Sequence, residues 1–137
     1  MTVCKNEILR FLKDIDNDFN PALSEKVILE EYVDKIYKKS HLVSHCLNNG
    51  KIVGLLVVYC NDFIDYRAYV ALVGVLKDYR GRGIAERMMR ECIDYVRCNN
   101  FKTIGIHSNN KIAINLYKKL GFNIIEDGNR VYMELNL

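Results

Sequence analysis

Apolar residues recur with the period of an amphipathic helix in two segments of the N-terminal third of the chain. They fall three or four positions apart between residues 6 and 16, and the same spacing returns between residues 24 and 39. Pro21 separates the two segments, and Ser24 is well placed to cap the second helix. The pattern therefore predicts helices over residues 6–16 and 24–39.

The next part of the chain has the composition of β-strands. Residues 41–47 and 51–60 are rich in β-branched and leucine side chains, and the Asn-Asn-Gly turn at 48–50 between them is typical of a hairpin. A turn at 61–62 then leads into a third apolar segment that ends at Leu76. These features predict a hairpin followed by a third strand.

The C-terminal half alternates helices and strands. Between residues 84 and 97 the apolar positions form one stripe and the charged residues lie opposite, which is typical of a helix lying on a sheet. Gly121 is a candidate left-handed cap for the helix that precedes it. The expected elements are a helix at 84–97, a strand at 103–107, a helix at 110–120, and two strands at 122–126 and 131–135 around an Asp127-Gly128 turn.

Composition and charge narrow the class of protein. The 137 residues are half apolar, include a single proline and carry a net charge of +3, which predicts one ordered domain over residues 1–137 without a nucleic-acid signature. The longest apolar stretch, residues 52–60, is far shorter than the roughly 20 residues that a membrane-spanning helix needs. We therefore expect no nucleic-acid partner and no membrane segment.

The cysteines and histidines point to neither disulfides nor a metal. The five cysteines are odd in number and include no Cys-x-x-Cys pair, so reduced thiols in a cytoplasmic protein are expected. The three histidines do not stand at ligand spacings with acids or cysteines, so no metal site is expected.

A basic, glycine-rich turn follows the third apolar strand. Gly81 and Gly83 can adopt backbone angles closed to other residues, so that consecutive amide N–H groups converge on one anion. The helix that begins near Gly83 adds unpaired N–H groups, and Arg80 and Arg82 add mobile positive charge. The turn lacks the Lys-Ser/Thr pair of a magnesium-nucleotide loop and the third glycine of a dinucleotide fingerprint. It therefore predicts a pyrophosphate cradle of another kind.

Two motifs resemble those of the GNAT acyltransferase superfamily. The glycine turn matches the coenzyme A pyrophosphate loop of that family as Arg80-x-x-Gly83-x-Ala85. A second segment matches the other GNAT signature as Asn110-x-x-Ala113-x-x-Leu116-Tyr117-x-Lys119-x-Gly121-Phe122. The resemblance is strong from about Val70 to the C-terminus and weak before Lys51.

This resemblance implies a mixed α+β fold: a mainly antiparallel central sheet with helices on both faces, in which one parallel strand pair splays apart. Acetyl-coenzyme A, the implied acyl donor, would lie in that gap with its pantetheine arm along the free backbone edge of residues 72–75, and no metal would take part. The residues expected to bind the coenzyme are Val73, Val75, Arg80, Gly81, Arg82, Gly83, Ile84, Ala85, Asn110 and Asn115.

Tyr117 is the expected catalytic residue. A phenol is normally protonated at neutral pH, so Tyr117 can donate a proton to the departing thiolate; packing between helix and sheet is the alternative. Asn110 can cap its helix, contact the coenzyme, or both, and Asn115 can face the coenzyme or solvent.

The general base is left open by the sequence. Many GNAT enzymes place an acid on the strand before the glycine loop, but residues 69–76 contain none. The candidates are Asp62, Asp65, Glu25, Tyr66, His107 and a water molecule.

The resulting prediction is an N-acetyltransferase that transfers an acetyl group from acetyl-coenzyme A to a primary amine of a small molecule, by direct attack in a ternary complex. The alternatives are transfer to a peptide or protein amine, and a noncatalytic acyl-coenzyme A sensor. A monomer or homodimer is expected.

Overall fold

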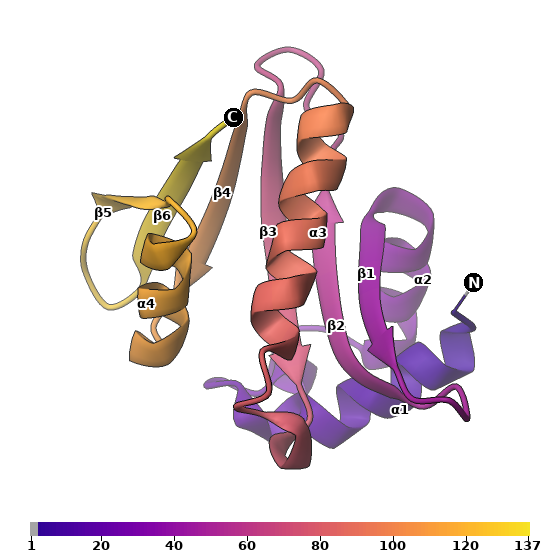
Figure 1. Ribbon diagram of the computed structural model, residues 1–137. Helices are drawn as coiled ribbons and strands as arrows, with labels where there is room; N and C mark the ends of the chain where they lie inside the picture. Colours follow the sequence, from indigo (N-terminus) through magenta and orange to yellow (C-terminus); the bar gives the residue numbers. More distant parts are fainter. Residues whose placement is uncertain (1–2) are drawn as a thin grey trace.

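The computed structural model describes residues 3–137, and its six strands form one sheet in the order β1-β2-β3-β4-β6-β5 (Figure 1). Neighbouring strands are antiparallel except for β3 and β4, which are parallel. The strands are β1 (His41–Cys46), β2 (Ile52–Tyr59), β3 (Arg67–Val75), β4 (Thr103–Ser108), β5 (Asn123–Glu126) and β6 (Val131–Asn136). The mixed, mainly antiparallel sheet with one parallel pair is confirmed.

Helices cover both faces of the sheet, as expected. The α-helices are α1 (Lys5–Ile15), α2 (Leu29–Lys39), α3 (Ile84–Cys98) and α4 (Lys111–Lys119), and single turns of 3₁₀ helix are η1 (Asp16–Asp18), η2 (Leu23–Glu25) and η3 (Lys77–Tyr79). One buried cluster joins α1 and α2 to the sheet, and a second joins α3 and α4 to the opposite face. We call these the α1/α2 face and the α3/α4 face.

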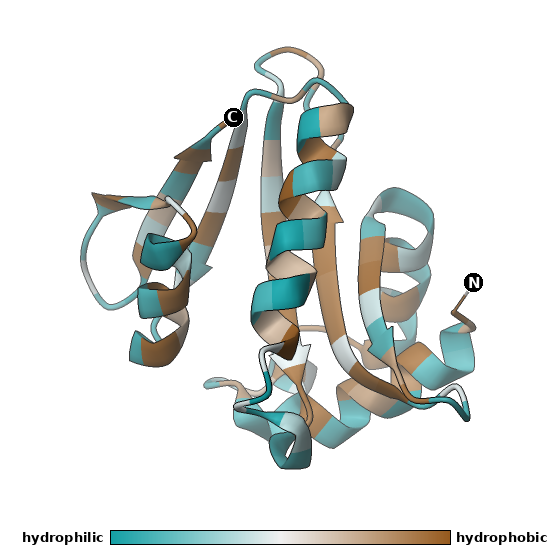
Figure 2. Cartoon of the chain, in the orientation of Figure 1, coloured by the Kyte–Doolittle hydropathy of each residue, from teal (hydrophilic) through white to brown (hydrophobic). Residues whose placement is uncertain are grey.

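Strand β2 lies under helices on both sides, which explains its continuous apolar sequence. Its residues from Ile52 to Val58 are all buried, as expected for a strand that contacts a hydrophobic layer on each face. Figure 2 shows β2 as mostly hydrophobic, whereas α3 carries hydrophilic bands on its outer side. At Gly54 an added Cβ would lie 2.9 Å from the Ile84 side chain, so this glycine allows α3 to pack close to the sheet.

The predicted second helix is shorter than expected. It begins at Leu29 instead of Ser24, because Ser24 is held in another interaction: its backbone N–H and its hydroxyl both donate to the carboxylate of Asp16, at 2.8 and 2.5 Å. The residues before α2 therefore form η1, η2 and an irregular connection between the two helices. This connection is the α1–α2 segment (residues 16–28), and it borders the site described below.

The parallel strands β3 and β4 diverge halfway along β3. Their pairing runs from Arg67 opposite Thr103 to Val70 opposite Ile106 and then stops. At the same place the pairing of β3 with β2 skips Ala71, which forms a bulge. Beyond it, β4 continues beside β6 while β3 continues beside β2. The splayed pair is therefore confirmed, and residues 71–75 of β3 have one edge without a strand partner.

Across residues 3–137, no helix combines the length and the hydrophobicity needed to cross a membrane.

Candidate active site

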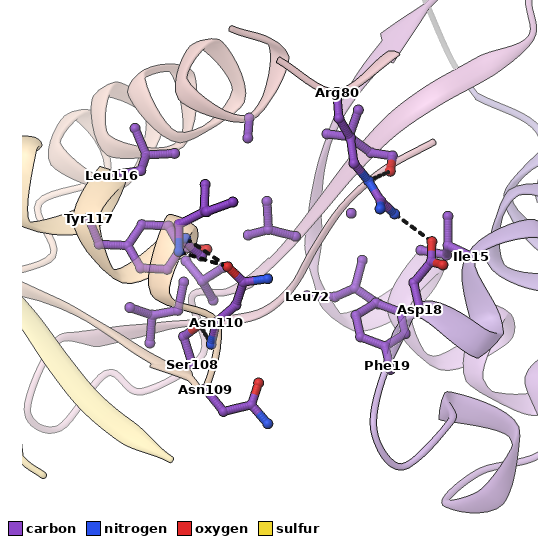
Figure 3. Close-up of a pocket in the computed structure, with 18 of the residues that line it drawn as sticks. Ile15, Asp18, Phe19, Leu72, Arg80, Ser108, Asn109, Asn110, Leu116 and Tyr117 are labelled. Atoms are coloured by element: carbon purple, nitrogen blue, oxygen red, sulfur yellow. Dashed lines mark hydrogen bonds and ion pairs between the residues drawn. The ribbon is translucent and has the colours of Figure 1, made fainter. Parts of the chain in front are cut away.

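A cavity of about 820 Å³ lies where β3 and β4 diverge. Its walls come from the α1–α2 segment, the free half of β3, the loop between β3 and α3, the end of β4, and α4 (Figure 3). Segments distant in sequence meet here because the separation of two neighbouring strands opens the sheet from one face to the other. Of the residues predicted to form the site, Val73, Val75, Arg80, Gly81, Gly83, Ile84, Ala85, Asn110 and Tyr117 line this cavity.

The glycine turn has the geometry of an anion cradle. Gly81 and Gly83 have φ angles of 75° and 78°, which are accessible to glycine at little cost. A Cβ at either position would meet nothing within 4 Å, so the backbone is open to an approaching group. Helix α3 begins at Ile84, and no side chain in the described part of the chain caps its N-terminus. Its first N–H groups are therefore available to a pyrophosphate.

The two arginines of this turn differ in their contacts, and Arg80 is anchored instead of mobile. The Arg80 Nε donates to the backbone oxygen of Val75 at 3.0 Å, and its Nη2 lies 2.5 Å from the Asp18 carboxylate (Figure 3). Arg80 thus links the glycine turn to the α1–α2 segment. The Arg82 guanidinium lies 4.9 Å from the centre of the Tyr79 ring, and Arg82 is not part of the cavity wall.

Tyr117 lies on the inner side of α4, with only 4% of its surface exposed. Its ring packs 5.9 Å from that of Phe122, while the residue also lines the cavity. Burial raises the pKa of Tyr117 to about 12. The phenol is therefore protonated throughout the neutral range and faces the cavity.

The two asparagines differ in their placement. The Asn110 side-chain oxygen accepts hydrogen bonds from the backbone N–H groups of Ile112 and Ala113, at 2.9 and 3.1 Å, so it caps α4. Asn110 also lines the cavity, and capping leaves its side-chain NH₂ group free to act as a donor. Asn115 is exposed and lies outside the cavity wall.

Most of the candidate general bases lie elsewhere. Asp62, Asp65 and Tyr66 belong to the turn before β3, at the opposite end of this strand from the cavity, and the Asp62 carboxylate accepts hydrogen bonds within that turn. Glu25 is exposed and absent from the cavity wall. His107 is the one candidate of the five that lines the cavity.

His107 is held by Tyr69, which no pattern in the sequence marks as a site residue. Its Nδ1 atom lies 2.7 Å from the hydroxyl of Tyr69. The register of the parallel pair explains this contact: Tyr69 lies opposite Gly105, two positions before His107, so no intervening side chain separates them. The His107 ring also packs 4.7 Å from that of Tyr132. A pattern along one strand cannot show a contact that depends on the register between two strands.

Tyr69 and His107 form a polar pair that lies on the α1/α2 face. Ala68, Val70 and Ile106 belong to the cluster under α3 and α4, so by the alternation of strand residues Tyr69 and His107 point the other way. Burial raises the pKa of Tyr69, and the positive charge of Arg130 opposes that rise. The glycine turn directly precedes α3 and therefore lies at the α3/α4 face. The cavity thus has one end formed by the glycine turn and another formed by polar side chains, joined through the gap in the sheet.

Comparison with known proteins agrees with this geometry. Residues 9–122 match the model of the acetyltransferase (GNAT) family. The chain is 32% identical over 103 residues to N-alpha-acetyltransferase MAK3 of Arabidopsis thaliana, covering 73% of this chain but only 54% of that protein. The chain therefore spans about half the length of this relative.

Two solved structures show the same fold. The ribosomal-protein-S18-alanine N-acetyltransferase from Escherichia coli superposes with a TM-score of 0.77 at 18% identity, covering 99% of this chain and 89% of that one. A GNAT family acetyltransferase from Elizabethkingia anophelis with acetyl-CoA bound has a TM-score of 0.64 at 18% identity, covering 78% and 82% of the two chains.

Proposed function

Since the chain belongs to the GNAT family of acetyltransferases, we propose that it transfers the acetyl group of acetyl-coenzyme A to the α-amino group of a peptide or protein. The observation that carries this proposal is the continuous cavity between the diverging strands, which joins the glycine cradle to Tyr117 and to the Tyr69–His107 pair. Such a passage lets a donor and an acceptor meet from opposite faces of one sheet.

The cavity fits the donor in three respects. The left-handed glycines and the uncapped start of α3 suit a pyrophosphate. The free edge of β3, which includes Val73, offers backbone groups to the amides of a pantetheine arm, much as a sheet edge accepts an added strand. The volume of about 820 Å³ is within the range of ligand sites in proteins. Acetyl-coenzyme A would supply a thioester, whose carbonyl carbon is open to attack by an amine.

The chain provides acid and base groups on the two sides of the gap. If His107 donates its Nδ1–H to Tyr69, its Nε2 lone pair is free to take the proton that the amine loses, directly or through a water molecule. Nitrogen bonds to the carbonyl carbon, the carbon–sulfur bond breaks, and Tyr117 donates its proton to the departing sulfur. Backbone N–H groups at the free edge of β3 would serve as donors to the carbonyl oxygen.

Direct transfer is favoured over a covalent acyl-enzyme. The part of the chain that the structure describes brings no cysteine into the cavity wall. Burial raises the pKa of the Cys92 thiol to about 12, with a further contribution from Cys60, whose own pKa burial also raises. Both thiols are therefore poor sources of the nucleophilic thiolate.

The proposed acceptor differs from the small molecule that the sequence suggested first. The relative from Arabidopsis thaliana is named as an N-alpha-acetyltransferase, and the E. coli structure is that of an enzyme named for an alanine of a ribosomal protein. The α1–α2 segment adds Phe19, Pro21 and Leu23 to the cavity wall, which are suited to contacts with a side chain of a peptide. Two other functions compete with this proposal: acetylation of small primary amines, and binding of the coenzyme without turnover.

The test is a turnover assay with matched acceptors. Peptides that carry one internal lysine would be offered with either a free or a blocked N-terminus, alongside small primary amines, and thiol release from acetyl-coenzyme A would be measured. Acetylation of the free peptides alone is expected. If blocked peptides turn over at the same rate, the acceptor is a lysine side chain and not the α-amine. If only the small amines turn over, the acceptor is a small molecule. If the coenzyme binds but no amine turns over, the protein is a sensor.

A further inference from the structure

The cavity wall contains more positively charged side chains than its own carboxylates can pair with. Both carboxylates of the wall already have cationic partners. Asp18 lies 2.5 Å from Arg80, and Glu86 lies 2.8 Å from Lys119 and 3.0 Å from Arg90. Two further cations of the wall, Lys26 and Arg130, form no ion pair with any residue from 3 to 137. The wall therefore carries two positive charges that its own carboxylates do not compensate.

These two cations belong to the acceptor end of the cavity. Lys26 follows η2 in the α1–α2 segment, beside Leu23 in the wall. Arg130 immediately precedes β6 and is close enough to Tyr69 for its charge to act on that phenol. Tyr69 and His107 point to the α1/α2 face, whereas the glycine cradle opens α3 on the opposite face. The start of α3 would hold the coenzyme phosphates from the α3/α4 face, whereas Lys26 belongs to the segment that borders the cavity on the α1/α2 face.

We propose that Lys26 and Arg130 select acceptor peptides that carry acidic side chains within their first few residues. The inference rests on the proposed function and adds the chemistry of the preferred acceptor. Each exposed ion pair of this kind changes an equilibrium constant by up to about 5-fold. An amine flanked by further cations, such as a polyamine or a lysine-rich N-terminus, would be repelled by the same two residues.

The experiment uses one peptide sequence with a free N-terminus in three versions, whose second and third residues are both aspartate, both serine or both lysine. The wild-type ratio of kcat/KM for the aspartate and lysine versions is expected to be about 10-fold. It should shrink when the salt concentration rises from 0.05 to about 0.5 M, because the charges are exposed. Free aspartate and glutamate are included as small acidic acceptors.

The variant that tests the two residues is Lys26→Glu combined with Arg130→Glu, in which the preference should reverse toward the lysine version. The control is Lys13→Glu combined with Lys38→Glu, which changes the net charge equally at exposed helix positions outside the cavity. The control should keep the wild-type preference, and the serine version should report the basal activity of every variant. Melting temperatures and coenzyme affinities confirm that the variants are folded.

The possible failures are distinguishable. Turnover of all three peptides at equal rates would overturn the charge preference and leave the peptide acceptor standing. If the control variant changes its peptide preference as much as the Lys26→Glu/Arg130→Glu variant, the preference depends on net charge. That result would overturn the role of these two residues. Turnover of free aspartate or glutamate without turnover of any peptide would keep the preference for a carboxylate but reject the peptide acceptor.

Discussion

The Tyr69 hydroxyl and the His107 Nδ1 atom are 2.7 Å apart at the last point where β3 and β4 still pair. The contact holds the imidazole ring at the narrow end of the gap, and the ring of Tyr132 packs against it from the next strand. The contact thus places the imidazole of His107, which can exchange protons, in the cavity. The two carboxylates of the cavity wall, Asp18 and Glu86, are both paired with cations. We therefore propose His107 as the group that accepts the proton of the amine.

Replacement of His107 by glutamine should lower kcat/KM about 10²-fold, within the range for loss of a general base. Tyr69→Phe removes the hydroxyl that holds the ring and should cause a smaller decrease, about 10-fold, since the base itself is retained. The pH profile of kcat/KM is the decisive measurement, because the acidic limb should vanish in His107→Gln and persist in Tyr69→Phe. Identical profiles for wild type and His107→Gln would assign proton removal to another group.

Tyr117→Phe should lower kcat about 10²-fold while the coenzyme affinity stays nearly constant. The ring of the phenylalanine would keep the contact with Phe122. Single-turnover kinetics and isothermal titration with coenzyme A separate the two effects. A stable Tyr117→Phe enzyme with full kcat would limit this residue to a packing role.

Alkaline pH should destabilise the fold through the buried phenols. Burial raises the pKa of Tyr117 to about 12, and burial together with Tyr59 raises that of Tyr32 to about 12. A raised folded-state pKa contributes stability that is complete below the unfolded-state pKa of about 10 and is lost as the pH rises toward 12. Urea midpoints between pH 9 and 12 should fall for wild type and fall less for Tyr32→Phe, with Tyr37→Phe on the same helix as the control.

Gly83→Val should abolish the increase in melting temperature that acetyl-coenzyme A causes in the wild type. A side chain at this position would occupy the open space above the cradle, and it would also strain a residue with φ of 78°. Gly50→Val separates these effects, because Gly50 has φ of 86°, an equally open environment, and a place in the β1–β2 turn away from the cavity. Both variants should be less stable, by about 1 kcal/mol or more, but only Gly83→Val should lose the ligand effect.

The pair formed by Asp18 and Arg80 should couple the two substrate sites. Asp18→Ala frees the α1–α2 segment from the glycine turn and should raise the KM for the acceptor several-fold. A double-mutant cycle with Arg80→Ala should give a coupling free energy of about 0.2–1 kcal/mol, since both side chains are partly exposed to solvent. Additive effects on both stability and KM would show that the pair has no influence on the acceptor site.

Local signals in the sequence were sufficient for most of the elements. The start of α3 at Ile84, the turn ending at Gly50 and the left-handed Gly121 all appear where residue type and spacing placed them. Ser24 is an exception: it has the right chemistry for a helix cap, but its hydroxyl donates to Asp16, eight positions earlier. A local pattern does not show when a distant partner takes up a capping group.

The presence of the glycine turn and of Tyr117 at one site could be predicted because each belongs to a contiguous motif. The other polar contacts of the site depend on the fold. The Tyr69–His107 and Asp18–Arg80 contacts join residues 38 and 62 positions apart. They depend on strand register and on the path of an irregular segment. The same reason explains why Arg80, expected to be a mobile charge, is an anchored one.

The unpartnered edge of β3 would make the stability of the protein depend on the supply of its proposed donor. Residues 71–75 lack a strand on one side, so the sheet is completed only when another backbone-like chain occupies the gap. A ligand that binds the folded state alone stabilises it by about 2.7 kcal/mol at a concentration 100 times its dissociation constant. When acetyl-coenzyme A is scarce, a larger fraction of molecules would open and become accessible to proteases, so that the abundance of the enzyme would follow the metabolic state of the cell.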